Sequence, residues 1–409
     1  MFIDLFLVIC CLLVNANTED MAAAPESLAQ DAFKNASEAC NKFSNTFYKA
    51  LVTDASGNLA SSPLSLHIVL SLLSHGASGM TAEQLKAALH LAGVDHPVHG
   101  EISLLLDTLK ALSKVELSLA NTIFIHNNIS LLPEFKLIST NSFKATVPKV
   151  DFEDSAGATQ QINAWVEENT KNKIKDCISA GSIKDDTKVI LVNAIYFKGN
   201  WADKFNPDFT TDRPFYVTQN QKKLVPTMFK KTKYPRGKIE SLNVEVVEIP
   251  YVNTDLDLLI ILPNEREGLE YLENNFDWDT IATARRFPND VEIYLPKFKL
   301  EVTSDLEQTL RKIGLHLIFE DLADFSSMTA MPLKVSSVIQ KVFVEINEEG
   351  SEAAATTVVQ MRLRRMINES SEFLVDHPFM FVIRHKPTNI PLFIGRVKDF
   401  DVPISRDEL

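Results

Sequence analysis

The sequence predicts one large α+β domain, and three observations support this fold class. Segments with apolar residues at helical spacing alternate along the chain with β-rich runs. No Pro- or Ser-rich linker and no repeat of fixed period divides the 409 residues. Hydrophobic residues make up 45% and charged residues 23% of the chain, which is typical of a soluble globular protein. We therefore expect helices and sheets that pack around a shared core.

The first part of this domain is predicted to contain three helices. Apolar residues recur every three or four positions over residues 33–51, which places them on one face of a helix. Ser62 followed by Pro63 predicts the start of a second helix, with Ser62 as its N-cap. Thr81 and Gln84 have the spacing of a capping box and predict the start of a third helix.

Five runs rich in β-branched and aromatic residues predict strands. They cover residues 117–125, 189–197, 244–249, 256–262 and 291–302. The run over 189–197 is apolar at every position except Asn193, which is typical of a central strand covered on both faces. A buried asparagine in such a strand needs hydrogen-bond partners.

Residues 348–372 predict a long exposed loop, because small and polar residues give way to bulky and basic ones with little apolar periodicity. Within it, Arg362-Leu363-Arg364-Arg365 places three guanidinium groups where a protease cleft with acidic subsites could bind them. This tetrapeptide matches the cleavage preference of the subtilisin-like proprotein convertases. Two other interpretations remain open: a site at which the chain itself is matured, or a chance run of charges.

Both ends of the chain carry patterns typical of targeting signals. Ten apolar residues over 5–14 are too few to span a bilayer and precede a small-residue site, so residues 1–16 predict a cleaved secretory signal. The last four residues match the tetrapeptides that the endoplasmic-reticulum retrieval receptor binds: Arg406, Asp407, Glu408 and Leu409. We therefore expect a retrieved secretory-pathway protein with this receptor as a partner, some secretion and no membrane insertion. A buried amino-terminal helix and a chance tetrapeptide are the alternatives.

The expected compartment gives meaning to two further residue types. Removal of the signal leaves Cys40 and Cys177, too few for a disulfide scaffold, which either pair or remain free thiols. Three sequons, at Asn35, Asn128 and Asn368, predict acceptors for N-linked glycans.

Several function classes lack their signatures in this sequence. A net charge of −13 argues against a general nucleic-acid binder. The nucleophile-elbow, P-loop and Cys-x-x-Cys motifs are absent, so neither an enzyme nor a cofactor is predicted. His96 and His99 have no suitably spaced third ligand, so no metal site is predicted. A basic cluster over residues 230–238 could recruit a polyanion, but Pro235 and Gly237 favour a solvated hairpin tip.

Four segments resemble the signatures of the serpin family, in the family's order. They are Asn193 to Trp201 (NAIYFKGNW), Leu295 to Phe298 (LPKF), Val344 to Thr357 (VEINEEGSEAAATT), and His377-Pro-Phe379 through Phe393-Ile-Gly-Arg396. The resemblance implies a serpin fold with three β-sheets, about nine helices and an exposed reactive-centre loop. It also implies a single domain over residues 17–409, which we expect to be a monomer.

Inhibitory serpins trap serine proteases. The protease attacks the loop and forms an acyl-enzyme, and the cleaved loop then inserts as a new strand into the main sheet. The displaced protease loses its oxyanion hole, so deacylation stops. Insertion requires small or β-compatible residues without proline at the start of the loop. The hinge that meets this requirement comprises Gly350, Ser351, Glu352, Ala353, Ala354, Ala355 and Thr356.

The resemblance also implies the bond that is cut. The usual family spacing, counted from Glu348, ends at Arg364, whereas the convertase pattern requires cleavage between Arg365 and Met366. We expect Arg365–Met366 for convertases, with Arg362, Leu363 and Arg364 read by the protease subsites, and Arg364–Arg365 for trypsin-like proteases. The alternatives to a convertase inhibitor are an inhibitor of secreted trypsin-like proteases and a non-inhibitory chaperone of the endoplasmic reticulum.

Opening of the main sheet in this family depends on a polar cluster under its strands. Ser62, Ser65 and Asn193 match that cluster, whereas Gln340 stands where the family usually has histidine. A glutamine amide can donate and accept, so we expect a hydrogen-bond network without a titrating group. Trp201 matches the tryptophan near the entry point of the loop, although a tryptophan is also an ordinary core residue.

Overall fold

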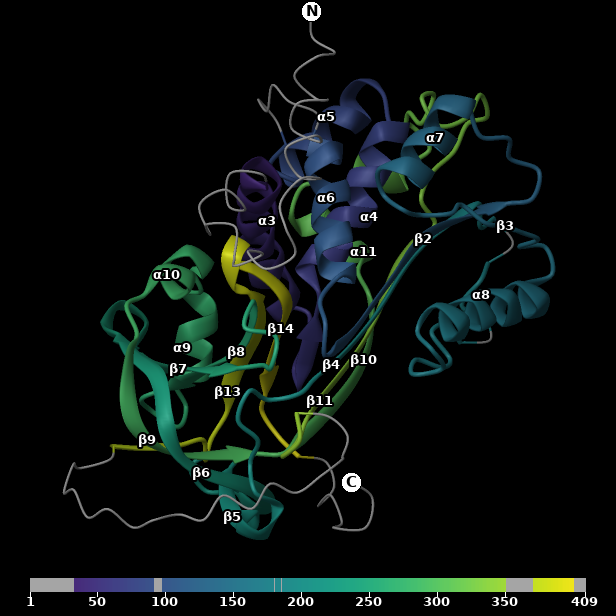
Figure 1. Ribbon diagram of the computed structural model, residues 1–409. Helices are drawn as coiled ribbons and strands as arrows, with labels where there is room; N and C mark the ends of the chain where they lie inside the picture. Colours follow the sequence, from purple (N-terminus) through teal and green to yellow (C-terminus); the bar gives the residue numbers. More distant parts are fainter. Residues whose placement is uncertain (1–32, 92–97, 180, 185, 351–370, 401–409) are drawn as a thin grey trace, which may run out of the picture.

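The computed structural model describes residues 33–91, 98–179, 181–184, 186–350 and 371–400 (Figure 1). These parts of the chain form nine α-helices and fourteen strands, which confirms the α+β class and agrees with the number of helices that the resemblance implies. The helices are α3 (Lys34–Val52), α4 (Pro63–Gly76), α5 (Gly79–Ala88), α6 (Val98–Lys110), α7 (Pro133–Asn141), α8 (Ser155–Asn169), α9 (Leu269–Asn274), α10 (Trp278–Thr283) and α11 (Glu307–Lys312).

The first two predicted helices are confirmed. Helix α3 buries Cys40, Phe43 and Phe47 on one face, as the spacing predicts. Helix α4 begins at Pro63, and the Ser62 hydroxyl accepts from the backbone N–H of Ser65 (3.3 Å).

The predicted capping box of the third helix is wrong, because α5 begins earlier, after Ser78. The Thr81 hydroxyl instead accepts from the N–H of Asp324 (3.0 Å), and Gln84 accepts from the N–H of Leu317 (3.0 Å). Both side chains therefore tie α5 to the segment that precedes β11 rather than capping their own helix.

The main sheet has five strands in the order β10-β11-β4-β2-β3. They are β2 (Val115–His126), β3 (Lys149–Val150), β4 (Val189–Gly199), β10 (Phe298–Asp305) and β11 (Ser337–Ile346). The run over 291–302, predicted as one strand, is two, because the chain leaves one sheet and enters another at Lys297. Only β11 with β4 and β2 with β3 are parallel neighbours among these strands.

The other strands form one continuous nine-stranded sheet where the resemblance implied two separate ones. Strand β6 causes this, because it is 18 residues long and pairs with β5, β7 and β9 along its length. The remaining strands are β1 (Leu59–Ser61), β5 (Thr211–Tyr216), β6 (Lys222–Ile239), β7 (Val244–Pro250), β8 (Leu256–Pro263), β9 (Phe287–Pro296), β12 (Ser371–Leu374), β13 (Phe379–His385) and β14 (Ile390–Val397).

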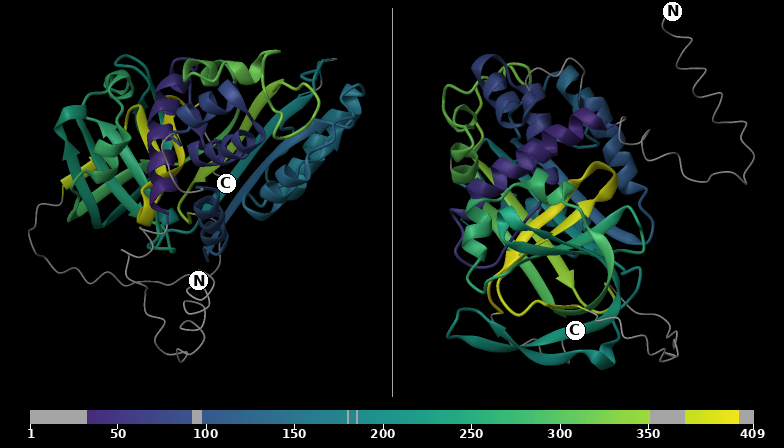
Figure 2. Two further views of the ribbon diagram at one scale, coloured as in Figure 1. Left: turned by 90° about the horizontal axis from the view of Figure 1, so that it is seen from above. Right: turned by 90° about the vertical axis from the view of Figure 1, so that its left-hand side faces the viewer.

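Two buried clusters lie on opposite faces of the main sheet. Alternate residues of β4 divide between them: Leu191 and Ile195 join the large core with α3 and α4, whereas Ile190 and Val192 join a smaller core under α8. Figure 2 shows the same layering, with α8 separated by the sheet from the other helices. This confirms that β4 is a central strand covered on both faces.

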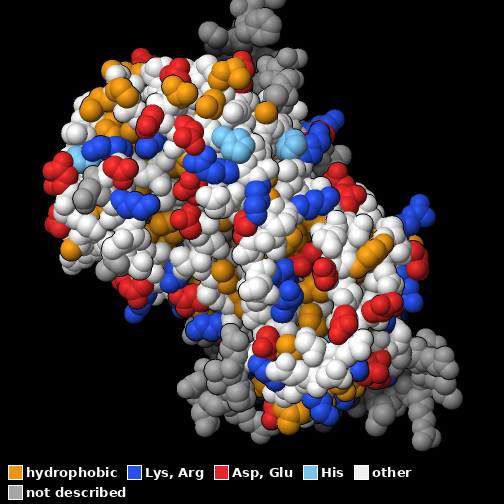
Figure 3. All heavy atoms as spheres, turned by 180° about the vertical axis from the view of Figure 1, so that it is seen from behind, with side chains coloured by type: hydrophobic (Ala, Val, Ile, Leu, Met, Phe, Trp, Pro, Cys, Tyr) orange, Lys and Arg blue, Asp and Glu red, His pale blue; other side chains and the backbone are white. Residues whose placement is uncertain are grey.

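Three further observations complete the fold. Cys40 and Cys177 are both buried free thiols. Of the two alternatives left open by the sequence, a disulfide or two thiols, the structure has the two thiols. Within the described ranges, no helix is both long and apolar enough to cross a bilayer. Acidic and basic side chains are intermingled over the face in Figure 3.

Candidate functional site: the seam between β4 and β11

The candidate site is the boundary between two parallel neighbours, β4 and β11, which we call the seam. Its register runs from Ser337 opposite Ile190 to Val344 opposite Phe197. The chain leaves the end of β11 and reaches β12 after residues 351–370, which lie outside the described residues. The predicted loop therefore follows β11, one of the two strands of the seam, in the sequence.

The direction of the two strands determines how a further strand could enter. A chain that turned back after β11 would run antiparallel to both β11 and β4. Insertion would replace one parallel ladder by two antiparallel ladders, and parallel pairing is slightly less stable per residue. Neighbouring strands lie about 4.8 Å apart, so the two halves of the sheet would separate by about that distance.

A row of three amides crosses the middle of the sheet. Gln340 on β11 lies opposite Asn193 on β4, which lies opposite Asn121 on β2. Gln340 Nε2 donates to Asn193 Oδ1 (2.6 Å), and Asn193 Nδ2 donates to Asn121 Oδ1. We call this row, with the serines that bond to it, the polar relay.

The relay is anchored to the start of α4. The Ser62 N–H donates to Gln340 Oε1 (3.1 Å), and Gln340 Nε2 donates back to the Ser62 carbonyl (3.0 Å). The Ser61 hydroxyl also donates to Gln340, and the Ser65 hydroxyl joins Asn193 to Asn121. The relay thus comprises Ser61, Ser62, Ser65, Asn121, Asn193 and Gln340, and its two neighbours across the seam are joined by a buried, uncharged hydrogen bond.

Four of these six residues were predicted, and two were missed. Ser61 lies just before the predicted helix start, where a serine is unremarkable as a sequence signal. Asn121 could have been found, because it is a polar residue inside the predicted β run over 117–125, as Asn193 is in its own strand. Register between distant strands then determines that they meet, and one sequence does not contain that information.

The hinge end of the seam is held by backbone contacts. Gly350 has a φ of +73°, and a Cβ there would lie 2.4 Å from the carbonyl oxygen of Gly199. Only glycine fits this close approach and left-handed conformation without strain. The N–H groups of Trp201 and Phe205 donate to the carbonyls of Glu349 (3.3 Å) and Glu348 (3.0 Å).

Glu348 is buried, which corrects the expectation that the exposed loop begins there. It is 8% exposed, and its carboxylate pairs with the Lys297 ammonium at 3.0 Å and accepts from the Thr210 hydroxyl at 2.6 Å. Neighbouring Glu349 pairs with Lys204, and both of those side chains are about one-third exposed or more. At the other end of the loop, residues 371–372 belong to β12 rather than to the loop.

Trp201 joins the hinge to the core. Its indole Nε1 donates to the carbonyl of Asn347 (2.8 Å), and its ring stacks on Tyr251 with centroids 4.6 Å apart. Trp201 is nevertheless 1% exposed, so both the functional and the core interpretation of this tryptophan agree with its position.

The basic cluster over residues 230–238 is not a hairpin tip. Pro235 and Gly237 lie inside β6, where a Cβ on Gly237 would lie 2.3 Å from the carbonyl of Arg285. Four of its five cations pair with carboxylates: Lys230 with Asp203, Lys231 with Glu292, and Arg236 and Lys238 with Glu245. This neutralisation does not favour a polyanion site.

The other predicted residues are not part of this site. The Asn35 side chain donates to Glu101 (2.8 Å), and Asn128 is exposed in the turn after β2, so glycosylation of either stays a prediction. Outside the described residues lie Ser351 to Thr356, Arg362 to Met366, Asn368, residues 1–16 and residues 406–409.

Comparison with known proteins identifies the fold family. Residues 38–400 match the family model described as "Serpin (serine protease inhibitor)". A leukocyte elastase inhibitor of Xenopus laevis is 39% identical, over 89% of this chain and 99% of that protein. Serpin B8 of Bos taurus is also 39% identical, over 83% of this chain and 92% of that protein. The crystal structure of Serpin48 of Tenebrio molitor has a TM-score of 0.83 and 30% identity, and covers 94% of this chain and all of that one.

These comparisons overturn the expected localisation. The relatives, a leukocyte elastase inhibitor and serpin B8, are intracellular serpins that lack secretory signals, whereas the terminal patterns predicted a retrieved secretory protein. Residues 38–400 include neither terminal pattern. The early secretory pathway is therefore a wrong expectation, and the retrieval receptor is not supported as a partner. The ten-residue apolar run and the terminal tetrapeptide are short patterns that lie outside the residues matched by the family model.

Three findings now agree: the seam with an adjacent hinge, the match over residues 38–400 and the structural likeness to Serpin48. Serpins act as protease inhibitors rather than as enzymes, and serine proteases are their general partners. The chain belongs to the serpin family of serine protease inhibitors.

Proposed function

We propose that this serpin is a suicide substrate that traps a furin-like, subtilisin-type proprotein convertase as an acyl-enzyme. The observation that supports the trap best is the seam itself: two parallel strands, joined in the middle by an uncharged relay, with the hinge glycine at their end. The arrangement accepts an added strand at the cost of few charged contacts. Small residues follow Gly350 in the sequence, with Glu352 in an alternation that turns it outward.

The choice of protease comes from Arg362-Leu363-Arg364-Arg365. Cleavage between Arg365 and Met366 would fill the first and fourth subsites of a convertase with arginine, and acidic subsites bind guanidinium groups well. Cleavage one residue earlier, at Arg364–Arg365, would suit a trypsin-like protease, whose first pocket carries an aspartate. Cleavage at Arg365–Met366 makes the segment from Glu348 to the cut bond one residue longer than the usual family spacing. Closure entropy tolerates one extra residue at small cost.

An elastase is the second candidate target, because relatives of this chain are named leukocyte elastase inhibitors. The first pocket of elastase is small and does not accept arginine. Val358 and Val359 are the residues of the loop that suit it, and cleavage after Val359 would release a fragment that begins at Gln360.

One experiment separates these targets. The purified protein is mixed with a furin-like convertase, trypsin or leukocyte elastase, the products are separated by denaturing electrophoresis, and the released carboxyl-terminal fragment is sequenced. We expect a detergent-stable complex with the convertase and a fragment that begins at Met366. Complete cleavage without a complex would contradict the trap, and a complex with elastase alone would contradict the convertase assignment.

Variants of the loop sharpen both parts of the proposal. Arg362→Ala is expected to weaken inhibition of the convertase far more than that of trypsin, because trypsin does not read the fourth subsite. Ala353→Arg is expected to convert the inhibitor into a substrate, because a charge would face the buried side of the sheet. Glu352→Arg is the matched control, since alternation places that side chain in solvent. Equal effects of the two substitutions on complex formation would contradict insertion.

A further inference from the structure

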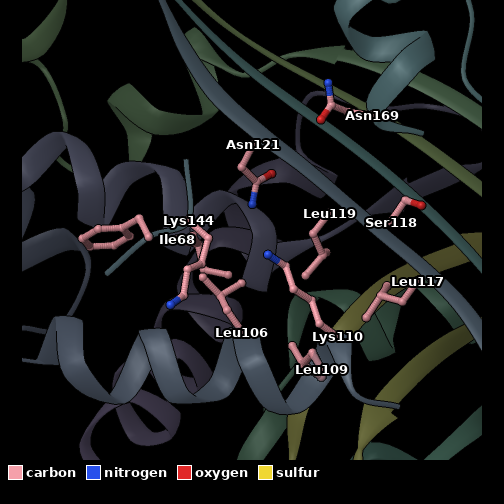
Figure 4. A pocket seen from close by; sticks show the side chains of 11 residues that line it. Ile68, Leu106, Leu109, Lys110, Leu117, Ser118, Leu119, Asn121, Lys144 and Asn169 are labelled. Carbon is pink, nitrogen blue, oxygen red and sulfur yellow. The ribbon is translucent and has the colours of Figure 1, made fainter. Parts of the chain in front are cut away.

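A cavity of about 270 Å³ lies beside the relay, between α6 and the main sheet (Figure 4). Its walls come from α4, α6, β2, the segment after α7 and the last residue of α8, Asn169. The apolar part of the lining consists of Ile68, Leu106, Leu109, Leu117, Leu119 and Phe143. At about 30 Å³ per water molecule, the cavity has room for about nine waters or for one small organic molecule.

The relay determines which atom of Asn121 is free to bond in this cavity. A backbone donor, the Ser62 N–H, requires Gln340 Oε1 as its acceptor, so the Gln340 nitrogen must face Asn193. Asn193 then presents its oxygen to Gln340 and its nitrogen to Asn121. The Asn121 oxygen is consumed by Asn193 and Ser65, which leaves its Nδ2 donor for the cavity, as Figure 4 shows.

Two cations complete the donor set. Lys110 and Lys144 line the cavity and are otherwise exposed, and no carboxylate belongs to the lining. In Figure 4 the ammonium end of Lys110 reaches toward the side of the cavity that carries Asn121. Lys144 also forms a half-exposed ion pair with Asp107 at 3.5 Å, and such pairs are weak enough to rearrange. Ser118 and Asn169 also line the cavity, and Figure 4 shows both apart from the ammonium groups of the two lysines. The polar groups nearest the apolar floor, Asn121 Nδ2 and the two ammonium groups, are thus donors.

We propose that this cavity binds a small amphipathic carboxylate, such as an aryl or short acyl acid. The carboxylate would accept from Asn121 Nδ2 and from the ammonium of Lys110, with Lys144 as the second cation. The apolar body of the ligand would pack between α6 and β2. An anion satisfies both donor types, whereas a neutral molecule leaves the cation without a partner.

Such a ligand would regulate the seam, and this part of the inference rests on the proposed function. Opening the seam by about 4.8 Å separates β2 and β4 from β11, and β2 then shifts over the helices beneath it. A ligand that contacts both α6 and β2, and bonds to a member of the relay, binds the closed sheet better than the opened one. It would therefore stabilise the native state and slow insertion of the loop.

The binding site is tested without any protease. Titration calorimetry and thermal unfolding are measured on the full chain with 3-phenylpropionate, and with 3-phenylpropionamide as the neutral molecule of the same shape. We expect saturable binding of the acid, with a dissociation constant of about 1 mM or below, and a raised melting temperature. Absence of binding by the acid, or equal binding of the acid and the amide, would overturn the proposal.

Lys110→Gln and Lys49→Gln form a matched pair of variants, because both lysines are exposed in the last turn of a helix. Lys110→Gln is expected to weaken binding of the acid by at least about tenfold, the loss of one charge-assisted hydrogen bond. Lys49→Gln is expected to leave it unchanged. Leu119→Trp, which fills the cavity, is expected to abolish binding without altering any charge. Equal binding by all four proteins would place the acid elsewhere and overturn the site.

Regulation is tested with trypsin under conditions in which the unliganded protein forms a complex. A saturating concentration of the acid is expected to slow complex formation by the wild type and to leave Lys110→Gln unaffected. An equal rate with and without ligand, once binding has been shown, would overturn the coupling to the seam. If no complex forms without ligand, either with trypsin or with a furin-like convertase, the trap itself fails, and the calorimetry still decides the binding site.

Discussion

The middle and the hinge end of the seam are held together by different chemistry. In the middle, Gln340 and Asn193 are neutral amides whose hydrogen bonds are buried. At the hinge end, Glu348 pairs with Lys297 in a nearly buried site, and Glu349 pairs with Lys204 in a more exposed one. The middle can exchange one set of hydrogen bonds for another without exposing a charge, whereas the hinge end cannot. We infer that the ionic end holds the loop out of the sheet and that the amide relay sets how easily the sheet parts.

Glu348→Lys should cause the largest loss of stability. It removes the partner of Lys297 and adds a second cation to a site with about 10% exposure, so the free energy of unfolding should fall by about 3–5 kcal/mol. Glu349→Lys is the matched control, because its pair is more exposed and contributes about 1 kcal/mol or less. Urea unfolding of both variants measures the difference. Similar losses in the two variants would show that burial of the Glu348 pair is unimportant.

Gln340→Leu should have the next largest effect. The leucine leaves the Ser62 N–H, the Ser61 hydroxyl and the Asn193 oxygen without partners, which costs about 1–3 kcal/mol. The Ser62 carbonyl still accepts from the N–H of Leu66 (3.2 Å). Val342→Ile, on the same face of β11, adds one methylene and breaks no hydrogen bond. The midpoint of urea unfolding should fall for the first variant and much less for the second. If Gln340→Leu proves as stable as the wild type, the relay does not hold the seam closed.

The contribution of His67 to the pH dependence of stability should be smaller. Burial lowers the pKa of His67 and His75 on α4, and of His385 on β13, to about 4, so all three residues contribute as the pH falls. The pKa of His67 is lowered although its Nε2 bonds to the carbonyl of Leu89. The unfolded chain, with a histidine pKa near 6.5, therefore binds the extra proton first. The stability that neutral His67 provides is present above about pH 6.5 and is lost as the pH falls, by about 2 kcal/mol between pH 7 and pH 5.

His67→Gln tests this assignment, because an amide can keep the hydrogen bond to Leu89 without titrating. Urea unfolding at pH 7 and pH 5 should show a smaller pH dependence in the variant by about that amount. An unchanged pH dependence would place the titrating group elsewhere.

Much of the fold could be predicted because its elements carry local signals. The burial of both faces of β4 follows from its unbroken apolar run, and the start of α4 follows from Ser62 and Pro63. The capping box at Thr81 failed because tertiary partners, the N–H groups of Asp324 and Leu317, compete for the same side chains. The basic cluster was misplaced because Pro235 and Gly237 are tolerated inside the long strand β6.

The site was predictable in its residues and not in its contacts. Asn193 indicated a buried polar network. Its partners Asn121 and Gln340 are determined by strand register, and they lie 72 and 147 residues away in the sequence. The burial of Glu348 depends on Lys297, which the sequence places at an ordinary strand boundary. The terminal patterns misled the prediction of localisation because they are short and independent of the fold.

The most direct test of the account is a disulfide that locks the seam. Val192 and Ile339 are opposite each other on β4 and β11, on the face under α8, and neighbouring strands are close enough for a disulfide. The native thiols of Cys40 and Cys177 are buried, and burial raises the pKa of each to about 12, so they should not interfere. The double variant Val192→Cys, Ile339→Cys is oxidised and mixed with a furin-like convertase, and its products are compared with those of the reduced form. We predict cleavage without a stable complex when the seam is locked and recovery of the complex on reduction. A stable complex formed by the oxidised protein would contradict insertion of the loop between β4 and β11.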